Sequence, residues 1–367
     1  MLRWFTALAI CTISCLAGRT EAQYAPRELF KFAKFKYDQG AYREALDYLD
    51  RALAADSVYQ NALFLRADIL VSLERYEEAV RCLDAGFALG EVAHATRAGY
   101  DLIRGKSLYQ QGRFTEAGDA IDLSLSLNLQ LAEAYYYRAQ LRYRQASYIE
   151  AFQDLVIAIN LDPLRPEYHF EQARQLEAYY QPQSNSPLFH RVLESVNTAI
   201  ALRPGELHYL RFKGDLLIRH RRYAEARETY DEIIKLHPGN PEVFSERAML
   251  RMKEGDFSGA VEDFTASIEM GQNDERNFRY RGLCYHNLNE LRAAEVDLSQ
   301  SITLMSRSLS ALNYDEQINN ALAETYIMRG SCLQTLGSTI QACRDFLAAQ
   351  ELGLRKGYNY YRKFCDF

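Results

Sequence analysis

The chain has 367 residues, of which 48% are hydrophobic, and its 43 basic side chains stand against 49 acidic ones. This composition is that of a globular protein and excludes collagen-like, disordered and disulfide-dense small folds. The net charge of −6 provides no basic excess to neutralise phosphates, so we expect no nucleic-acid partner.

The first 22 residues have the layout of a secretory signal peptide. A basic start at Arg3 precedes an apolar run over residues 4–18, and small residues stand just before Gln23. The run is too short to span a membrane, and it is apolar on every face, unlike the first helix of a folded domain. We therefore expect export to the periplasm or cell envelope. A lipoprotein signal that is acylated at Cys15 stays open as an alternative, and only this alternative predicts an association with the outer membrane.

A period of 34 residues organises the chain after the signal. In most periods a small residue is followed nine positions later by an aromatic residue and three positions beyond that by alanine. Two examples are Ala139, Tyr148 and Ala151, then Ala248, Phe257 and Ala260. This recurring pattern closely resembles the tetratricopeptide repeat. The resemblance implies an all-α fold, an α-solenoid in which helical hairpins stack into a right-handed superhelix.

We expect nine repeats over residues 26–356, followed by a C-terminal capping segment at 357–367. The few prolines, 8 in all, fall at the predicted helix ends or in insertions, where they do not break a helix. Insertions are expected at 94–97, 181–187 and 309–322. The repeats are predicted to start at residues 26, 60, 98, 132, 166, 207, 241, 275 and 323.

Four arginines are each followed by an aspartate sixteen residues later. In a helical hairpin whose turn lies midway, such partners stand at the same height on facing helices, which favours an ion pair inside the repeat. A role for these arginines in reading a ligand is the alternative. The pairs are Arg138 with Asp154, Arg247 with Asp263, Arg281 with Asp297, and Arg329 with Asp345.

Cysteines and histidines show no spacing that is typical of a metal site, and no catalytic or nucleotide-binding motif occurs. We expect no enzyme activity, no cofactor, no metal and no small-molecule substrate. Cys343 and Cys365 would face each other across a final hairpin that turns near Gly353, so in an oxidising compartment they are able to bond. The ending also resembles the last repeat of exported tetratricopeptide proteins of the Bacteroidota type, which favours a disulfide. Two separate buried thiols are the alternative.

By the same resemblance, first helices line a concave face on which partners lie as extended peptides or helices. In the first five repeats the inward positions are rich in aromatic rings, which offer contact area at a low cost in entropy. The alternative is that these rings pack against neighbouring repeats. The candidate binding residues are Phe30, Lys34, Tyr37, Phe64, Asp68, Lys106, Tyr109, Tyr136, Gln140, Tyr143, Phe170 and Arg174. In the later repeats the same positions are more polar and include Arg211, Asp215, Ser245, Met249, Arg279, His286, Ser331 and Gln334.

The sequence thus predicts a non-catalytic scaffold of the cell envelope that binds a protein or peptide partner in its concave groove. The alternative is a fixed subunit of an envelope assembly for secretion or uptake, joined to its partners through insertions and edges.

Overall fold

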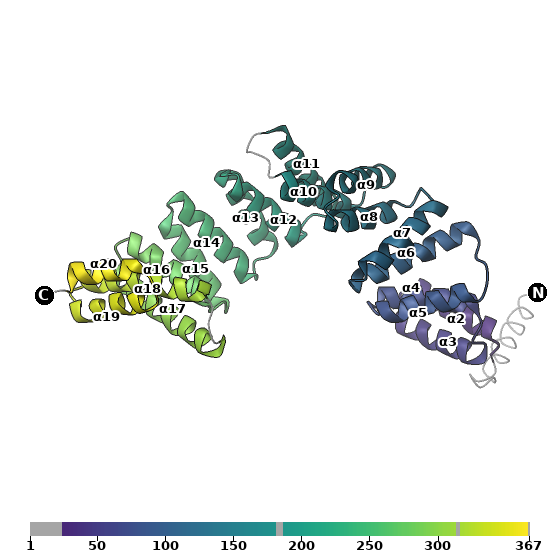
Figure 1. The fold of residues 1–367 in the computed structure, drawn as a ribbon, viewed down its shortest axis with the longest axis horizontal. Coiled ribbons are helices and arrows are strands. Elements are labelled where there is room, and N and C mark those ends of the chain that lie inside the picture. Colours follow the sequence, from purple (N-terminus) through teal and green to yellow (C-terminus); the bar gives the residue numbers. More distant parts are fainter. Residues whose placement is uncertain (1–23, 181–185, 313–315, 366–367) are drawn as a thin grey trace, which may run out of the picture. The chain divides into compact units, whose positions relative to one another are not determined.

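The computed structural model describes residues 24–180, 186–312 and 316–365, which form α-helices and short connections without a β-strand (Figure 1). The expected signal peptide at 1–22, including Cys15, lies outside the described residues. The chain is divided into two compact units between Tyr179 and Tyr180. None of the described helices has the length and apolar character that are needed to cross a membrane.

The N-terminal unit consists of four antiparallel helical hairpins followed by one further helix. Each hairpin packs its second helix against the first helix of the next hairpin, and two apolar clusters of buried residues fill the stack. The helices are α2 (Pro26–Asp38), α3 (Tyr42–Ala55), α4 (Gln60–Ser72), α5 (Tyr76–Ala88), α6 (His94–Gln110), α7 (Phe114–Leu127), α8 (Ala132–Arg144), α9 (Tyr148–Leu161) and α10 (Pro166–Tyr180).

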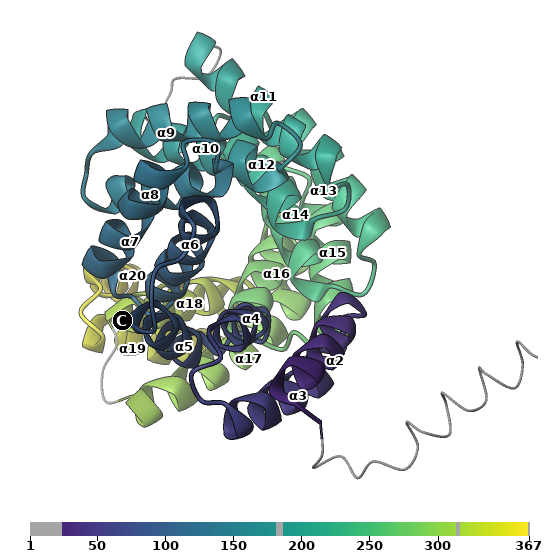
Figure 2. The same ribbon diagram turned by 90° about the vertical axis from the view of Figure 1, so that its right-hand side faces the viewer.

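The C-terminal unit begins with one helix, continues with four hairpins and ends with a short capping helix (Figure 2). The fifth expected repeat therefore supplies α10 to the N-terminal unit and α11 to the C-terminal unit. The helices are α11 (Pro187–Leu202), α12 (Leu207–Arg219), α13 (Tyr223–Leu236), α14 (Pro241–Glu254), α15 (Phe257–Glu269), α16 (Glu275–Asn287), α17 (Leu291–Leu312), α18 (Glu316–Thr335), α19 (Thr339–Glu351) and α20 (Arg355–Phe364).

The tight turn inside each of these eight hairpins depends on one residue with a left-handed backbone. In the first hairpin Gly40 has a φ of 74°, and the amide of Ala41 donates back to the carbonyl of Lys36 at 2.9 Å. This bond satisfies a carbonyl that the end of α2 leaves open. The equivalent turn residues in the other hairpins are Glu74, Gly112, Ala146, Arg221, Gly255, Asn289 and Gly337.

Small residues sit where the two helices of a hairpin cross, as the repeat pattern predicts. Ala139 and Ala248 are fully buried at these crossings. At Gly330 an added Cβ atom would lie 2.6 Å from Cε1 of Phe346, too close for two carbon atoms. A larger side chain at these positions would separate the helices and open the core.

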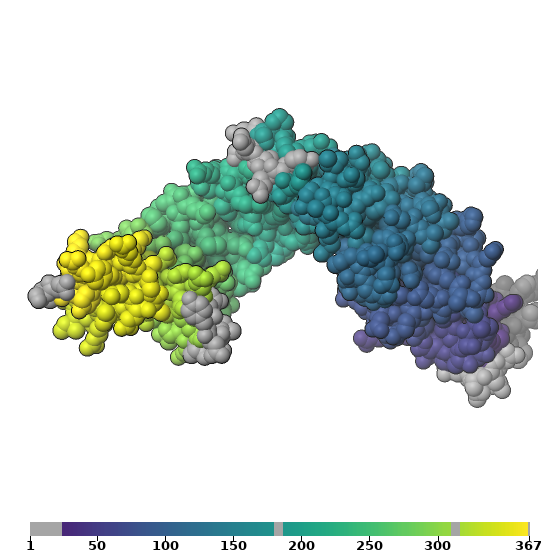
Figure 3. Space-filling view, viewed as in Figure 1, coloured from purple at the N-terminus to yellow at the C-terminus, as the bar shows by residue number. Residues whose placement is uncertain are grey.

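Helix α20 caps the C-terminal end of the array by packing on α19 and α18, and Figure 3 shows this yellow end as a closely filled body. A Cβ atom at Gly357 would lie 2.7 Å from the backbone nitrogen of Gln350 and from the carbonyl oxygen of Phe346. Glycine therefore allows α20 to contact α19 backbone to backbone. The disulfide between Cys343 and Cys365 joins the same two helices, so the bond expected there is present.

The expected insertions mostly lengthen helices rather than forming loops. Residues 94–97 are the first turn of α6, which begins before the expected start at residue 98. Much of 309–322 belongs to the end of α17 and the start of α18, with 313–315 outside the described residues. In the third insertion, residues 181–185 are likewise not described, and α11 begins at Pro187 with the Ser186 hydroxyl accepting from the amide of Phe189 at 3.1 Å.

Candidate partner-binding surface

All four expected arginine–aspartate pairs are present as bidentate hydrogen bonds between the two helices of a hairpin. The guanidinium of Arg281 donates from Nε to Asp297 at 2.7 Å and from Nη2 at 2.8 Å. Asp297 is only 4% exposed, so its charge depends on this partner. Equivalent bonds of 2.6–2.9 Å join Arg138 to Asp154, Arg247 to Asp263, and Arg329 to Asp345.

The same arginines also reach the second helix of the preceding repeat. Arg247 donates to Asp231 at 2.7 Å, and Arg281 donates to the Thr265 hydroxyl at 3.0 Å. The hydrogen bond to Asp263 raises the pKa of Arg247 above its usual value. Each arginine thus links three helices, which assigns the group to the structure of the array rather than to ligand recognition.

Among the residues that the structure describes, three cysteines are free, and all three are packing residues. Cys82 occupies the aspartate position of its repeat, and its sulfur accepts from Nη1 of Arg66 at 2.9 Å. Burial raises the pKa of the Cys284 thiol to about 12 and that of Cys332 to about 11. Such thiols are not reactive nucleophiles.

In the N-terminal unit, side chains of successive first helices are hydrogen-bonded across a separation of 31 residues. The Tyr37 hydroxyl on α2 donates to Asp68 on α4 at 2.5 Å. The Tyr109 hydroxyl on α6 donates to Gln140 on α8 at 2.8 Å. These four residues are among the expected binding residues. The structure joins them into two hydrogen-bonded pairs, each of which connects one repeat to the next.

Several of the expected aromatic residues also pack against rings of the neighbouring helix. The ring centroids of Tyr136 and Tyr168 lie 5.0 Å apart, and those of Tyr143 and Tyr148 lie 5.1 Å apart. Such contacts hold the rings in place but leave Tyr136 and Tyr143 partly exposed. Phe30 is placed in the same way against Tyr59, with centroids 5.3 Å apart, and Phe170 is also half-buried.

Phe64 is a correction to the expected surface. It is 2% exposed, because Tyr100 stacks on it with centroids 4.2 Å apart and Phe87 lies at 5.4 Å. Phe64 therefore belongs to the core between the second and third hairpins and cannot contact a partner.

The charged residues of the expected surface differ in whether they already contact an acidic side chain of the protein. Lys34 is exposed on α2. Lys106 lies 2.6 Å from Glu133, and Arg174 makes two hydrogen bonds of 2.9 and 2.6 Å to Glu171. Contact of these residues with a partner stays a prediction.

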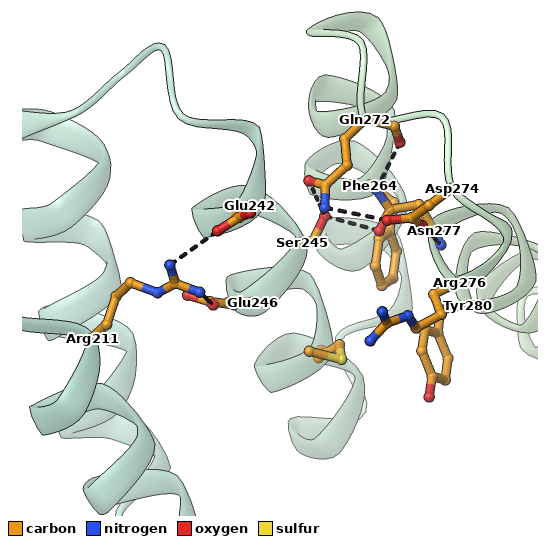
Figure 4. A pocket seen from close by; sticks show the side chains of 11 residues that line it. Arg211, Glu242, Ser245, Glu246, Phe264, Gln272, Asp274, Arg276, Asn277 and Tyr280 are labelled. Carbon is orange, nitrogen blue, oxygen red and sulfur yellow. Dashed lines mark hydrogen bonds and ion pairs between the residues drawn. The ribbon is translucent and has the colours of Figure 1, made fainter. Parts of the chain in front are cut away.

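A pocket that the residue pattern did not predict lies within the C-terminal unit, between α12, α14 and α16 (Figure 4). Its volume is about 320 Å³. On one wall Arg211 extends from α12 and donates to Glu242 on α14 at 3.0 Å and to Glu246 one turn further along. On the opposite wall stand Arg276 and Tyr280 of α16, and Met249 and Phe264 add apolar surface.

The end of the pocket near the α15–α16 connection is fixed by a buried polar network. The Ser245 hydroxyl donates to the side-chain oxygen of Asn277 at 2.9 Å. The amide of Asn277 donates to the Ser267 hydroxyl at 3.1 Å and to the carbonyl of Gln272 at 3.0 Å. The Gln272 amide in turn donates to Asp274 at 3.3 Å. These bonds tie α14, α15 and α16 together, so this end of the pocket is held in place.

One feature of the sequence could have revealed this pocket. Arg211, Ser245 and Met249 occupy the same repeat positions as the expected surface of the N-terminal unit, and Arg211 and Glu242 show the same separation of 31 residues. Glu242 and Glu246 were missed because carboxylates in the first turns of a helix usually face solvent.

Comparisons with known proteins agree with the repeat pattern. Family models described as tetratricopeptide repeat match residues 36–89 and 191–241. The human mitochondrial import receptor subunit TOM70 is 21% identical over 76% of this chain and 45% of its own length. Human tetratricopeptide repeat protein 13 is 34% identical over 32% of this chain and 13% of its own length. The chain thus spans less than half of the length of the curated relatives it matches.

Among solved structures, the C-terminal part of a tetratricopeptide repeat protein from Cytophaga hutchinsonii shares the fold, with a TM-score of 0.52 and 15% identity. The match covers 68% of this chain and 98% of that one. Matching repeats in both halves of the chain, the 34-residue period and the stacked hairpins lead to one conclusion: the chain contains tetratricopeptide repeats and has the α-solenoid fold that such repeats build.

Proposed function

We propose that this protein is an exported, non-catalytic scaffold of the cell envelope, and that it holds a segment of a partner protein against the exposed side of its first helices. The observation that carries the proposal is the set of hydrogen bonds between successive first helices, such as Tyr37 to Asp68 and Tyr109 to Gln140. They fix side chains along the surface before any partner arrives. A preorganised surface loses little conformational entropy on binding.

The exposed parts of this surface have the chemistry of a protein-binding site. Half-exposed tyrosines offer apolar ring area together with a hydroxyl, and lysine and arginine side chains stand beside them. A relative that is named as an import receptor subunit supports a role in binding polypeptides. Its partners are not transferred to this chain.

Two observations support export. The first 22 residues have the pattern of a signal peptide, and Cys343 and Cys365 form a disulfide. Structural disulfides persist in oxidising compartments such as the periplasm and are rare in the cytosol.

A second candidate function is that of a fixed subunit in an envelope assembly. It is favoured by large apolar side chains that are exposed on second helices and in connections, namely Ile149, Leu164 and Ile340. Such residues are where a permanent neighbour would attach. The segment 181–187 is an additional attachment point in this alternative.

A pull-down from the native envelope separates the two functions. We expect the double variant Lys34→Glu, Tyr143→Ala to lose the partner that the wild-type protein captures, because it reverses a charge and removes a ring on the first-helix surface. The control Arg43→Glu, Ile149→Ala reverses a charge and truncates an exposed apolar side chain on second helices, and it should retain the partner.

The deletion of residues 181–187 completes the comparison. If the partner is lost from the deletion variant or from the second-helix control while the first-helix variant keeps it, the fixed-subunit function replaces the proposed one. Thermal unfolding of all variants, followed by circular dichroism, shows that any loss of binding is not a loss of fold.

A further inference from the structure

The pocket in the C-terminal unit combines two kinds of wall. Glu242 and Glu246 place carboxylates on one side, while Met249, Phe264 and Tyr280 supply apolar and aromatic surface. A lysine or arginine side chain has the matching composition, because a long apolar stem carries a charged head. The volume of about 320 Å³ is enough for one such side chain.

The charges in the pocket favour a cation over an anion. Arg211 is already bound to Glu242 and Glu246, so its positive charge is compensated within the pocket. Arg276 is 76% exposed at the rim and is largely screened by water. The three carboxylates of Glu242, Glu246 and Asp274 outnumber the two arginines, Arg211 and Arg276, that line the pocket.

Among the groups that line the pocket, Glu246 is the one that a hydrogen-bond donor on a ligand would stabilise most. Its side chain is 18% exposed, and one carboxylate oxygen is held by Arg211. The other oxygen makes no hydrogen bond to any residue that the structure describes. Burial also raises the pKa of Glu246 above its ordinary value. The unbonded oxygen is covered in the free protein, so the carboxylate must turn toward the pocket to meet a ligand. A buried carboxylate oxygen without a hydrogen bond lowers the stability of the folded protein. A bound cation would remove this loss of stability.

A neighbouring pocket indicates that the cation is part of a longer chain. Arg276 also lines a second pocket, again of about 320 Å³, whose other lining residues are the polar Glu275, Arg279 and Gln317 and the apolar Met305, Ile318 and Ala321. The two pockets thus share one rim residue, and the second one is more apolar. An extended peptide places successive side chains into adjacent pockets, whereas a free small cation would use only the first.

From these observations we infer that the pocket between α12, α14 and α16 binds a lysine or arginine side chain of an extended peptide, with Glu246 and Glu242 as its ionic partners. This inference rests on the proposed function, since it specifies which feature of the partner the scaffold recognises. It adds a binding site in the C-terminal unit to the surface proposed for the N-terminal unit.

The test selects peptides from a displayed library of random nonapeptides on the whole chain lacking residues 1–22. We expect the selected peptides to share a lysine or arginine at one position. The Glu246→Gln variant should bind such a peptide about tenfold more weakly, which corresponds to about 1.4 kcal/mol. The matched control Glu228→Gln, which removes an exposed carboxylate on α13, should bind it as the wild type does.

A double-mutant cycle identifies the contact. Replacing the basic residue of the peptide by glutamine should weaken binding to the wild type about tenfold but should have no further effect on the Glu246→Gln variant. If Glu246→Gln does not fold, Glu242→Gln serves in its place, because the Glu242 side chain is 56% exposed. Selected peptides without a shared basic residue, or losses that simply add, would overturn the inference and leave the proposed function intact. If no peptide is selected and the native envelope yields no partner, both fail.

Discussion

Replacing Arg281 by alanine is expected to lower the local free energy of unfolding around α16 and α17 by about 3 kcal/mol. The substitution removes both hydrogen bonds to Asp297 and the link to Thr265 on α15. Asp297, which is almost fully buried, is then left without its partner, and the cost comes mainly from that uncompensated charge. Hydrogen exchange of the α16 and α17 amides measures this change locally, which suits an array whose repeats need not unfold together.

Two further variants make this result specific. The control Arg292→Ala removes an exposed arginine from α17 and should change the local free energy by less than about 0.5 kcal/mol. Arg247→Ala should lower the melting temperature by several degrees but cost less than Arg281→Ala, because Arg251 still lies 3.2 Å from Asp263. Neither Arg281→Ala nor Arg247→Ala should abolish partner binding. Equal effects of Arg281→Ala and Arg292→Ala would show that the buried pair contributes nothing.

Removal of the disulfide is expected to release the capping helix. Cys343 and Cys365 are 22 residues apart, and closing a loop of this size stabilises a fold by about 3 kcal/mol. In the double variant Cys343→Ser, Cys365→Ser, the amides of α20 should exchange much faster, while those of α12 to α16 should change little. Loss of the cap would also uncover Phe346, which α20 helps to bury.

Reduction of the wild-type protein provides the matched control. Reductant should accelerate exchange in α20 of the wild type to the rate of the double variant and should leave the double variant unchanged. Mass spectrometry of unreduced peptides identifies the bond directly. Free thiols at both positions in the protein isolated from its native cells would contradict this account of the C-terminal end.

Much of the fold could be predicted because the same sequence pattern, and with it the same contact between two helices, recurs along the chain. The sixteen-residue separation of Arg281 and Asp297 follows from the symmetry of a hairpin about its turn, and the same logic places Cys343 opposite Cys365. The lengths of α6, α17 and α18 could not be predicted in this way, because added residues that continue a helix look like an insertion in a repeat alignment.

The binding surface was harder to predict, since it depends on which side chains of neighbouring repeats meet. Phe64 occupies an inward position, yet Tyr100 of the next repeat covers it. The pocket at Glu246 was missed because its walls come from three first helices and from the connection before α16. The separation of 31 residues that joins Tyr37 to Asp68 and Arg211 to Glu242 is the signal that would have indicated these contacts.

The central claim is that the first helices, and not the second ones, contact the partner. The most direct measurement places a photo-crosslinking amino acid at exposed positions of both kinds in the native cells: Lys34 and Arg276 on first helices, Ile149 and Ile340 on second helices. We expect illumination to crosslink one and the same partner protein to the positions of Lys34 and Arg276. No adduct should form at the other two positions. Adducts from Ile149 and Ile340 alone would contradict the central claim.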